Sequence, residues 1–286
     1  MEAGRRLAQS RVECECGGTD ECALQHGVEH TLPPMAQMTW IGHGTALVDL
    51  DGVRLLTDPL LRNRVAHLHR HAPLPPPAAL RGIDAVLLTH LHRDHLDLPS
   101  LRRIGRDVPV VVPRGGGGLL LRRGFDAVRE IAPGEEITVG SLTVEATEAR
   151  HGGGRSMLGA RGPALGYLVS GTRSIYHAGD TDLFDGMRVI GARGLDLALV
   201  PIWGWASRLG PGHLNPLRAA QALELLAPRT AVPIHWGTYA VGPAARKPPA
   251  YLSAPLEPFL AEAAELAPDV RVVALEPGQS LEISSS

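Results

Sequence analysis

The chain has 286 residues and a formal net charge of −2 at pH 7, and 44% of its residues are apolar. A chain of this length can bury a core without disulfide bonds or other cross-links. Its near-neutral charge argues against a nucleic acid or another polyanion as its partner. Its 13 histidines outnumber its Trp, Tyr and Phe residues together, and their placement is therefore the first feature to explain.

Residues 1–37 show neither an alternating nor a helical pattern of apolar residues. We predict a disordered tail here, although Cys14, Cys16 and Cys22 with two nearby histidines can also be read as a small zinc site. The sequence has no secretory signal and no apolar run near the roughly 18 residues that cross a membrane. We therefore expect a cytoplasmic protein whose folded domain spans residues 38–286.

From residue 38 onward the chain alternates between strand-like and, later, helix-like segments. Alternating segments around Asp51-Gly52 and Gly140-Ser141 predict two hairpins. The pair Asn215-Pro216 is typical of a helix start, whereas Leu61–Pro77 is expected to be a loop and Gly115–Gly118 a turn. Predicted strands are 45–57 with its turn, 84–89, 108–112, 136–145, 165–169, 174–177, 197–200, 231–234 and 270–275; predicted helices are 99–103, 217–226 and 253–266.

This order of elements predicts an α/β or α+β sandwich in which helices cover two sheets. The segment His90-Leu91-His92-Arg93-Asp94-His95 follows directly on the predicted strand 84–89. Imidazole binds zinc, iron and similar cations, and a carboxylate adds an anionic oxygen. His90 and His92 point to the same face of an extended chain, because the side-chain period of a strand is two. Asp94 and His95 fall where the chain turns, so they are able to face a second metal position.

Three more residues of the same type follow at predicted strand ends. His151 comes after the strand that ends near residue 148, Asp180 after 174–177, and His235 after 231–234. One metal ion needs three or four ligands, so two ions need roughly seven with one of them shared. We therefore interpret the whole set as metal ligands: His90, His92, Asp94, His95, His151, Asp180 and His235.

This pattern resembles the metallo-β-lactamase superfamily, whose mark is H-x-H-x-D-H followed by His, Asp and His. The resemblance covers residues 38–282, and its details are similar to the branch of ascorbate-6-phosphate lactonases and N-acyl phosphatidylethanolamine phospholipases D. The matching segments are Trp40–Thr45, Leu56–Pro59, Gly212–Pro216 and Pro233–Thr238. The resemblance implies a four-layer αββα sandwich with a dinuclear site at one edge.

The resemblance also implies a division of the ligands. His90, His92 and His151 would hold one ion, Asp94, His95 and His235 the other, and Asp180 would bridge them. Two divalent ions, zinc or alternatively manganese or iron, would share a hydroxide that is a nucleophile at neutral pH. We expect a hydrolase of an ester, lactone or phosphodiester.

Several other residues are candidates for supporting roles. His43, Asp58 and Asp97 are expected to orient metal-bound side chains, although either Asp could instead belong to a turn. His213 is a candidate general acid for the leaving group, or a histidine that packs a loop. Trp203, Trp205 and Arg208 lie on a segment expected to overhang the metals, where they would form an apolar wall and an anion clamp.

Alternative functions remain open on the same ligands. A dinuclear-iron oxidoreductase would need an electron route that the sequence does not display, and a nucleic-acid phosphodiesterase would need a basic segment that it lacks. We expect a small-molecule substrate, no nucleic-acid partner and no membrane span, with a homo-oligomer as an open possibility.

Overall fold

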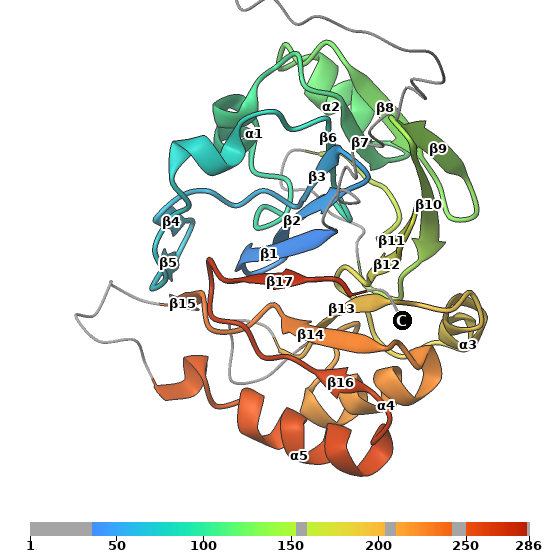
Figure 1. Cartoon of the computed structure of the whole chain (residues 1–286). Helices are drawn as coiled ribbons and strands as arrows, with labels where there is room; N and C mark the ends of the chain where they lie inside the picture. The colour runs from blue at the N-terminus through green and yellow to red at the C-terminus, as the bar shows by residue number, and fades with distance from the viewer. Residues whose placement is uncertain (1–35, 153–158, 204–209, 242–249, 285–286) are drawn as a thin grey trace, which may run out of the picture. The chain divides into compact units, whose positions relative to one another are not determined.

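The structure is a computed structural model that describes residues 36–152, 159–203, 210–241 and 250–284. These residues form a sandwich of two large mixed sheets with helices on the outside (Figure 1). The predicted αββα sandwich is confirmed. Residues 1–35, which include the cysteines and most of the predicted tail of residues 1–37, lie outside the described residues, whereas Gln37 already belongs to the first strand of the fold.

The first sheet has seven strands in the order β17-β1-β2-β3-β6-β7-β8. Its hairpin at Asp51-Gly52 is the predicted one, and both residues have positive φ angles, 51° and 79°. From β3 to β8 the strands run parallel. The bounds are β1 Gln37–Gly42, β2 Thr45–Leu50, β3 Val53–Thr57, β6 Ala85–Leu87, β7 Val110–Pro113, β8 Val128–Ile131 and β17 Ser280–Glu282.

The second sheet also has seven strands, in the order β16-β14-β13-β12-β11-β10-β9. Strands β12, β13, β14 and β16 are parallel, so the carboxyl ends of β12, β13 and β14 meet at one edge. The bounds are β9 Glu136–Val139, β10 Leu142–Glu148, β11 Leu165–Ser170, β12 Ser174–His177, β13 Leu197–Pro201, β14 Thr230–Ile234 and β16 Arg271–Val272.

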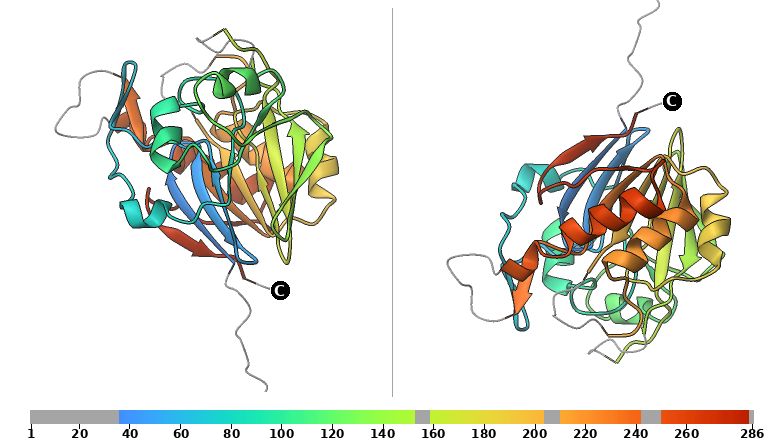
Figure 2. Two further views of the ribbon diagram at one scale, coloured as in Figure 1. Left: turned by 90° about the horizontal axis from the view of Figure 1, so that it is seen from above. Right: turned by 90° about the horizontal axis from the view of Figure 1, so that it is seen from below.

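Helices cover the outer faces of both sheets (Figure 2). One apolar cluster joins α1 and α2 to the first sheet, and a larger one fills the space between the sheets and continues under α4 and α5. Asn215 begins α4 as predicted, because its side chain accepts a hydrogen bond from the Arg218 amide at 2.9 Å. The bounds are α1 Leu98–Ile104, α2 Gly117–Leu121, α3 Gly186–Gly191, α4 Pro216–Leu226 and α5 Leu256–Leu266, with short 3-10 helices at Pro77–Leu80 and Ala250–Leu252. None of the helices in the described residues is long and apolar enough to cross a lipid bilayer.

The prediction of a loop over Leu61–Pro77 is wrong. This segment contains β4 (Arg64–Val65) and β5 (Leu68–Arg70), which form a three-stranded sheet with β15 (Tyr239–Val241). We call it the small sheet. The partner strand lies about 170 residues away in the sequence, and a local pattern cannot reveal such a pairing.

Smaller differences have similar causes. Gly115–Gly118 is not only a turn, since α2 begins at Gly117, and the predicted strand 270–275 shortens to β16. Strands β1, β8 and β17 and helix α3 have no strong local signal and were not predicted. Of these, β1 has the greatest functional interest, because it leads into the turn that carries His43.

Core packing beneath the second sheet depends on α5, which lies along α4 (Figure 2). Phe259 is fully buried, whereas the side chain of the next residue, Leu260, is 38% exposed. We expect Phe259→Ala to lower the free energy of unfolding by about 3–5 kcal/mol, because it removes buried surface and leaves a cavity. Leu260→Ala, the matched control, should cost less than about 1 kcal/mol. Denaturant unfolding monitored by circular dichroism measures both, and equal losses would contradict this description of the core.

Candidate metal centre

The candidate ligands come from strand ends of both sheets and converge at one edge of the sandwich. His90 and His92 follow β6, and Asp94 and His95 lie in the turn before α1. The remaining three follow strands of the second sheet: His151 after β10, Asp180 after β12 and His235 after β14. The structure thus brings together residues that lie up to 145 positions apart in the sequence.

A first group consists of His90, His92 and His151, whose ligand atoms lie within 4.8 Å of one another. The Nε2 atom of His90 is 3.0 Å from Nδ1 of His92, and Nε2 of His151 is 3.1 Å from that same Nδ1 atom. A tetrahedral zinc ion with bonds of about 2.0–2.1 Å places neighbouring ligand atoms about 3.3 Å apart. The two measured separations are close to this value, so the three nitrogens can share one cation.

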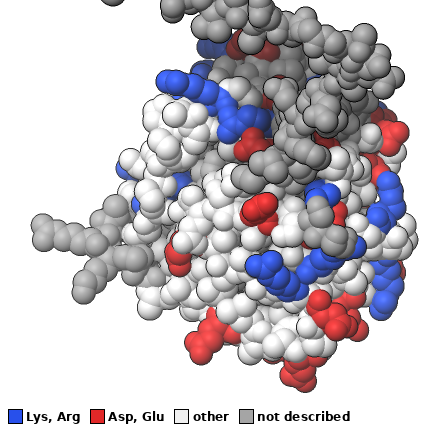
Figure 3. Space-filling view, in the orientation of Figure 1, with Lys and Arg blue, Asp and Glu red and all other residues white. Residues whose placement is uncertain are grey.

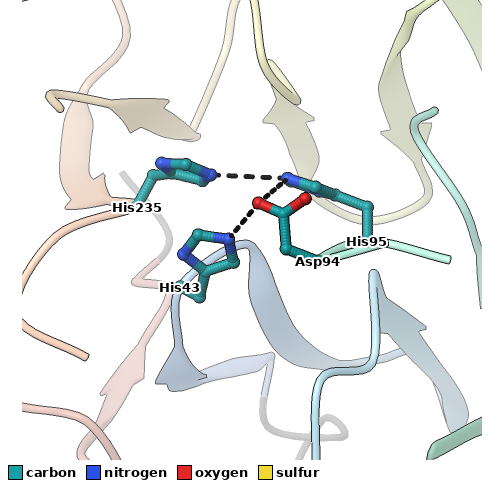
Figure 4. Close-up of side chains that lie close together, drawn as sticks. All are labelled: His43, Asp94, His95 and His235. Atoms are coloured by element: carbon teal, nitrogen blue, oxygen red, sulfur yellow. Dashed lines mark hydrogen bonds and ion pairs between the residues drawn. The ribbon is translucent and has the colours of Figure 1, made fainter. Parts of the chain in front are cut away.

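A second group contains Asp94, His95 and His235, with His43 beside them (Figure 4). The Nε2 atoms of His95 and His235 are 3.4 Å apart, and Nε2 of His95 is 3.7 Å from Oδ2 of Asp94. His43 donates through Nε2 to the same carboxylate oxygen at 3.0 Å. The spacing of this group also suits one cation.

Asp180 lies between the two groups. Its Oδ1 atom is 3.2 Å from Nε2 of His235, and its Oδ2 atom is 3.5 Å from Nε2 of His95 and 4.0 Å from Nε2 of His90. The side chain is 5% exposed. A buried carboxylate in this position needs cations around it to offset its desolvation.

Three of the candidate imidazoles have the nitrogen that points away from the centre held by a hydrogen bond. Nδ1 of His95 donates to Oδ2 of Asp58 at 2.7 Å. Nδ1 of His151 donates to the Gly212 carbonyl at 2.7 Å, and Nδ1 of His235 donates to the Trp203 carbonyl at 2.8 Å. These bonds place the proton on Nδ1 and leave the Nε2 lone pair directed at the centre.

Asp58 acts on two ligands at once. It follows β3, is fully buried, and accepts the Thr89 amide at 2.8 Å and the Thr89 hydroxyl at 2.6 Å in addition to His95. The Thr89 hydroxyl oxygen lies 3.0 Å from Nδ1 of His90, from which it accepts a hydrogen bond. One carboxylate thus orients a ligand of each group.

Burial and electrostatics set the protonation of the histidines. Burial lowers the pKa of His90 well below its usual value, and the neighbouring His95 lowers it further. Burial likewise lowers the pKa of His92 and His151, and that of His235 to about 3. These imidazoles are neutral at pH 7 and have a lone pair available to bind metal.

For the other members of the centre, Asp94, Asp180 and His95, neighbouring charges outweigh the effect of burial on the pKa. Burial opposes ionisation of Asp94 and Asp180, but nearby histidines (His95 first for Asp94, His235 first for Asp180) hold both carboxyl pKa values well below normal. Burial also disfavours a charged His95, yet the carboxylates of Asp180, Asp58 and Asp94 outweigh it and raise its pKa. The centre therefore presents anionic oxygens and four neutral imidazoles, together with one imidazole, that of His95, whose positive charge the carboxylates favour.

This donor set fits a metal centre. Nitrogens that approach one another at 3.0–3.1 Å repel unless a proton or a cation lies between them, and buried carboxylates are stabilised by coordination. Histidine and aspartate together suit zinc, iron and manganese. The His and Asp groups are thus able to bind metal.

The other residues singled out from the sequence lie in different places. His213 is 3.7 Å through Nε2 from Oδ2 of Asp180, beside the centre and partly exposed. His177 is buried and contacts the Gly44 carbonyl at 3.1 Å. Trp203 is half-buried and its ring packs at 5.9 Å from that of Tyr251. Trp205 and Arg208 lie outside the described residues.

Asp97 was predicted to orient a metal-bound histidine, but the structure gives it a different role. Asp97 is the N-cap of α1, where Oδ2 accepts from the Ser100 amide at 3.1 Å and its hydroxyl at 2.6 Å. It also pairs with Arg62, with an Nη2–Oδ1 distance of 2.6 Å. Although Asp97 follows His95 by only two residues, its carboxylate is bound to the first turn of α1 and to Arg62.

Sequence reasoning missed three groups that hold the ligands. Thr89 precedes His90 directly, and this adjacency was the one available signal. The carbonyls of Gly212 and Trp203 have no signal in a sequence, because any residue has a carbonyl and only the fold decides where it points.

Comparisons with known proteins agree with this geometry. The profile of the β-lactamase superfamily domain matches residues 53–236, so the chain belongs to this superfamily. The expectation of a metal-dependent hydrolase is thereby confirmed at the level of the family. A UPF0173 metal-dependent hydrolase of Methanopyrus kandleri is 34% identical over 86% of this chain and 99% of its own length.

Two further similarities cover most of the chain. An N-acyl-phosphatidylethanolamine-hydrolyzing phospholipase D of Caenorhabditis elegans is 33% identical over 71% of this chain and 64% of its own length. Among solved structures, Igni18, a metallo hydrolase of the archaeon Ignicoccus hospitalis, has a TM-score of 0.68 and 24% identity, covering 88% of this chain and 100% of its own. This second likeness shows the fold.

The support given by Asp58 leads to a prediction for Asp58→Asn. An amide has one acceptor oxygen instead of two, so it cannot satisfy the Thr89 and His95 donors together. We expect the affinity for Zn²⁺ to fall about 10–100-fold, as measured by competition with a chromophoric chelator. Asp196→Asn is the matched control, because Asp196 accepts from the Ser174 amide at the start of β12, away from the centre. Unchanged affinity in Asp58→Asn would contradict this role.

Proposed function

We propose that this protein is a dinuclear metal-dependent phosphodiesterase that acts on a small molecule. The observation that carries the proposal is the position of Asp180 between two groups of ligand atoms, with one oxygen near His235 and the other near His90 and His95. When bound, two divalent ions supply an activated water for attack and a positive charge that stabilises the developing oxyanion.

The names of two related proteins support a phosphodiester as the substrate rather than an ester or a lactone. Proteins of Caenorhabditis elegans and Saccharomyces cerevisiae that match over 71% and 81% of this chain, at 33% and 30% identity, are named as N-acyl-phosphatidylethanolamine-hydrolyzing phospholipases D. The reaction that this name describes breaks a phosphodiester bond. We propose the same type of bond for the substrate of this protein.

The distribution of charge argues against a nucleic acid as the substrate. Acidic and basic side chains are interspersed on the face seen in Figure 3, and the described part of that face has no continuous basic stripe. A surface that follows a nucleic-acid backbone is expected to be strongly basic. The net charge of −2 points the same way.

The protein's own groups have distinct tasks in this reaction. Asp94 and Asp180 are ionised and contribute the negative charge that holds the cations, while His90, His92, His151 and His235 are neutral and offer lone pairs. His213 is partly exposed beside Asp180 and donates through Nδ1 to the Gly210 carbonyl at 3.2 Å. In its protonated form, Nε2 can give a proton to the leaving oxygen.

The first test uses protein loaded with Zn²⁺ or Mn²⁺ and three substrates: bis(p-nitrophenyl) phosphate, p-nitrophenyl acetate and a simple lactone. We expect preferential hydrolysis of the phosphodiester, loss of activity with a chelator and recovery on adding the ion back. Asp94→Ala should lower kcat/KM more than about 100-fold, because it removes a ligand rather than its support, whereas Asp196→Asn should retain activity. A preference for the acetate or the lactone would overturn the phosphodiesterase assignment, and activity in verified metal-free protein would overturn the mechanism.

The role of His213 makes a separate prediction. With His213→Ala, kcat for a phosphodiester that has an alkyl leaving group should fall about 10²–10⁴-fold, because a basic alkoxide needs a proton as it departs. Hydrolysis of bis(p-nitrophenyl) phosphate should change little, since nitrophenolate leaves without protonation. Steady-state kinetics on both substrates measures the contrast, and equal losses on the two would argue against a general acid.

A further inference from the structure

The turn between β1 and β2 holds His43 in a backbone conformation that is uncommon for a residue with a side chain. Its φ angle is 56°, in the left-handed region, and His235 across the centre has a φ angle of 64°. Such conformations cost free energy and persist where the surrounding structure enforces them, often at functional sites. The strained backbone at His43 therefore indicates that this residue has a functional role.

The surrounding structure fixes His43 on every side. Its amide donates to the Thr238 hydroxyl at 2.9 Å, and its carbonyl accepts from the Trp40 indole at 3.0 Å and from the His235 amide at 3.0 Å. The imidazole rings of His43 and His235 lie with their centroids 3.8 Å apart and their planes 34° apart.

The glycines on either side make this arrangement possible. A Cβ atom on Gly42 would lie 2.8 Å from the Thr238 side chain, and one on Gly44 would lie 3.1 Å from the His95 ring. Gly42 also has a φ angle of 128°. The close approach of the turn to Thr238 and to His95 thus depends on the absence of side chains next to His43.

The effect of this fixed geometry is to aim the imidazole at Asp94 (Figure 4). Nε2 of His43 lies 3.0 Å from Oδ2 of Asp94, a normal hydrogen-bond distance, and the His43 side chain is 3% exposed. Asp94 lies in the turn before α1, outside any regular element. A carboxylate on such a turn gains orientation from a buried and rigid donor.

We propose that His43 is a positioning residue: its Nε2–H donates to Asp94 and holds that carboxylate in the orientation in which, together with His95 and His235, it binds the second ion. The inference rests on the proposed dinuclear function and deepens it. It also assigns the two groups unequal support, because Asp58 orients a ligand of each group whereas His43 serves the second alone.

A direct ligand role for His43 is the competing reading, since its ring nitrogen lies within 4.8 Å of the other ligand atoms of the second group. With Asp94, His95, His235 and Asp180 as ligands and one position kept for the reacting water, the second ion would already be five-coordinate, which would leave no place for His43. A hydrogen bond also uses the single N–H that a neutral imidazole has, and places it on the atom that faces Asp94. Donation is therefore the better account of the 3.0 Å contact.

A pair of amide substitutions tests the proposal. The side-chain nitrogen of Asn ends near the position of histidine Nδ1, too short to reach Asp94, and Asn tolerates a left-handed backbone well. The side-chain nitrogen of Gln reaches the position of Nε2 and can donate as His43 does. His43→Asn therefore removes the hydrogen bond while respecting the turn, and His43→Gln restores it.

The readout is Zn²⁺ binding to metal-free protein, measured by chelator competition for each equivalent, together with the visible absorption of the Co²⁺-substituted protein. We expect His43→Asn to weaken the second equivalent about 10–100-fold and leave the first unchanged, with the Co²⁺ spectrum altered at the second equivalent only. His43→Gln should recover most of the affinity. Asp196→Asn, the control used above, changes a residue that contacts the start of β12 away from the centre and should bind as the wild type does. Circular dichroism and thermal melting of each variant verify the fold.

The outcomes separate this inference from the proposed function. If the wild-type protein binds two ions and His43→Asn holds the second with unchanged affinity, the role of His43 is wrong and the dinuclear function stands. If Gln and Asn weaken binding equally, His43 is a ligand rather than a positioning residue. If the wild-type protein binds only one ion, the dinuclear function fails and the role of His43 fails with it.

Discussion

The buried carboxylate of Asp58 is the interaction on which the centre depends. It is fully buried and accepts hydrogen bonds from the Thr89 amide, the Thr89 hydroxyl and Nδ1 of His95, and through Thr89 it also fixes His90. A buried charge of this kind is costly unless it is fully hydrogen-bonded. The strand pairing of β3 with β6 places Asp58 beside Thr89, so the core of the first sheet and the orientation of two ligands are parts of one arrangement.

Around that carboxylate, the two sheets contribute different parts of the centre. The first sheet supplies the closely spaced candidate ligands from His90 to His95, and the second supplies the candidates His151, Asp180 and His235 from the ends of separate strands. The centre therefore forms only when the sheets pack against each other through their shared apolar core. Metal affinity and tertiary structure are coupled for this reason.

Much of this was predictable from the sequence, and the limits have physical causes. The hairpin at Asp51-Gly52, the start of α4 at Asn215 and the convergence of His90, His92 and His151 follow from local patterns or from the ends of strands. The small sheet was not predictable, because β5 pairs with β15 far along the chain. Asp97 was named beside Asp58 because it lies close to the ligands in sequence, and a local pattern did not decide between that role and the turn position that it has at the start of α1. The Gly212 carbonyl has no signal in a sequence at all.

Arg70 on β5 gives the small sheet a consequence for the centre. Its guanidinium is buried and donates to the Ile41 carbonyl at 2.6 Å, to the Leu60 carbonyl at 3.2 Å and to the Tyr239 hydroxyl at 3.3 Å. Ile41 lies two residues before His43, and the Tyr239 ring meets that imidazole edge-on at 5.6 Å. The small sheet contributes none of the candidate ligands, yet it supports the turn between β1 and β2 that carries His43. Substitutions in that sheet are therefore able to alter the candidate metal centre without changing any of its His and Asp residues.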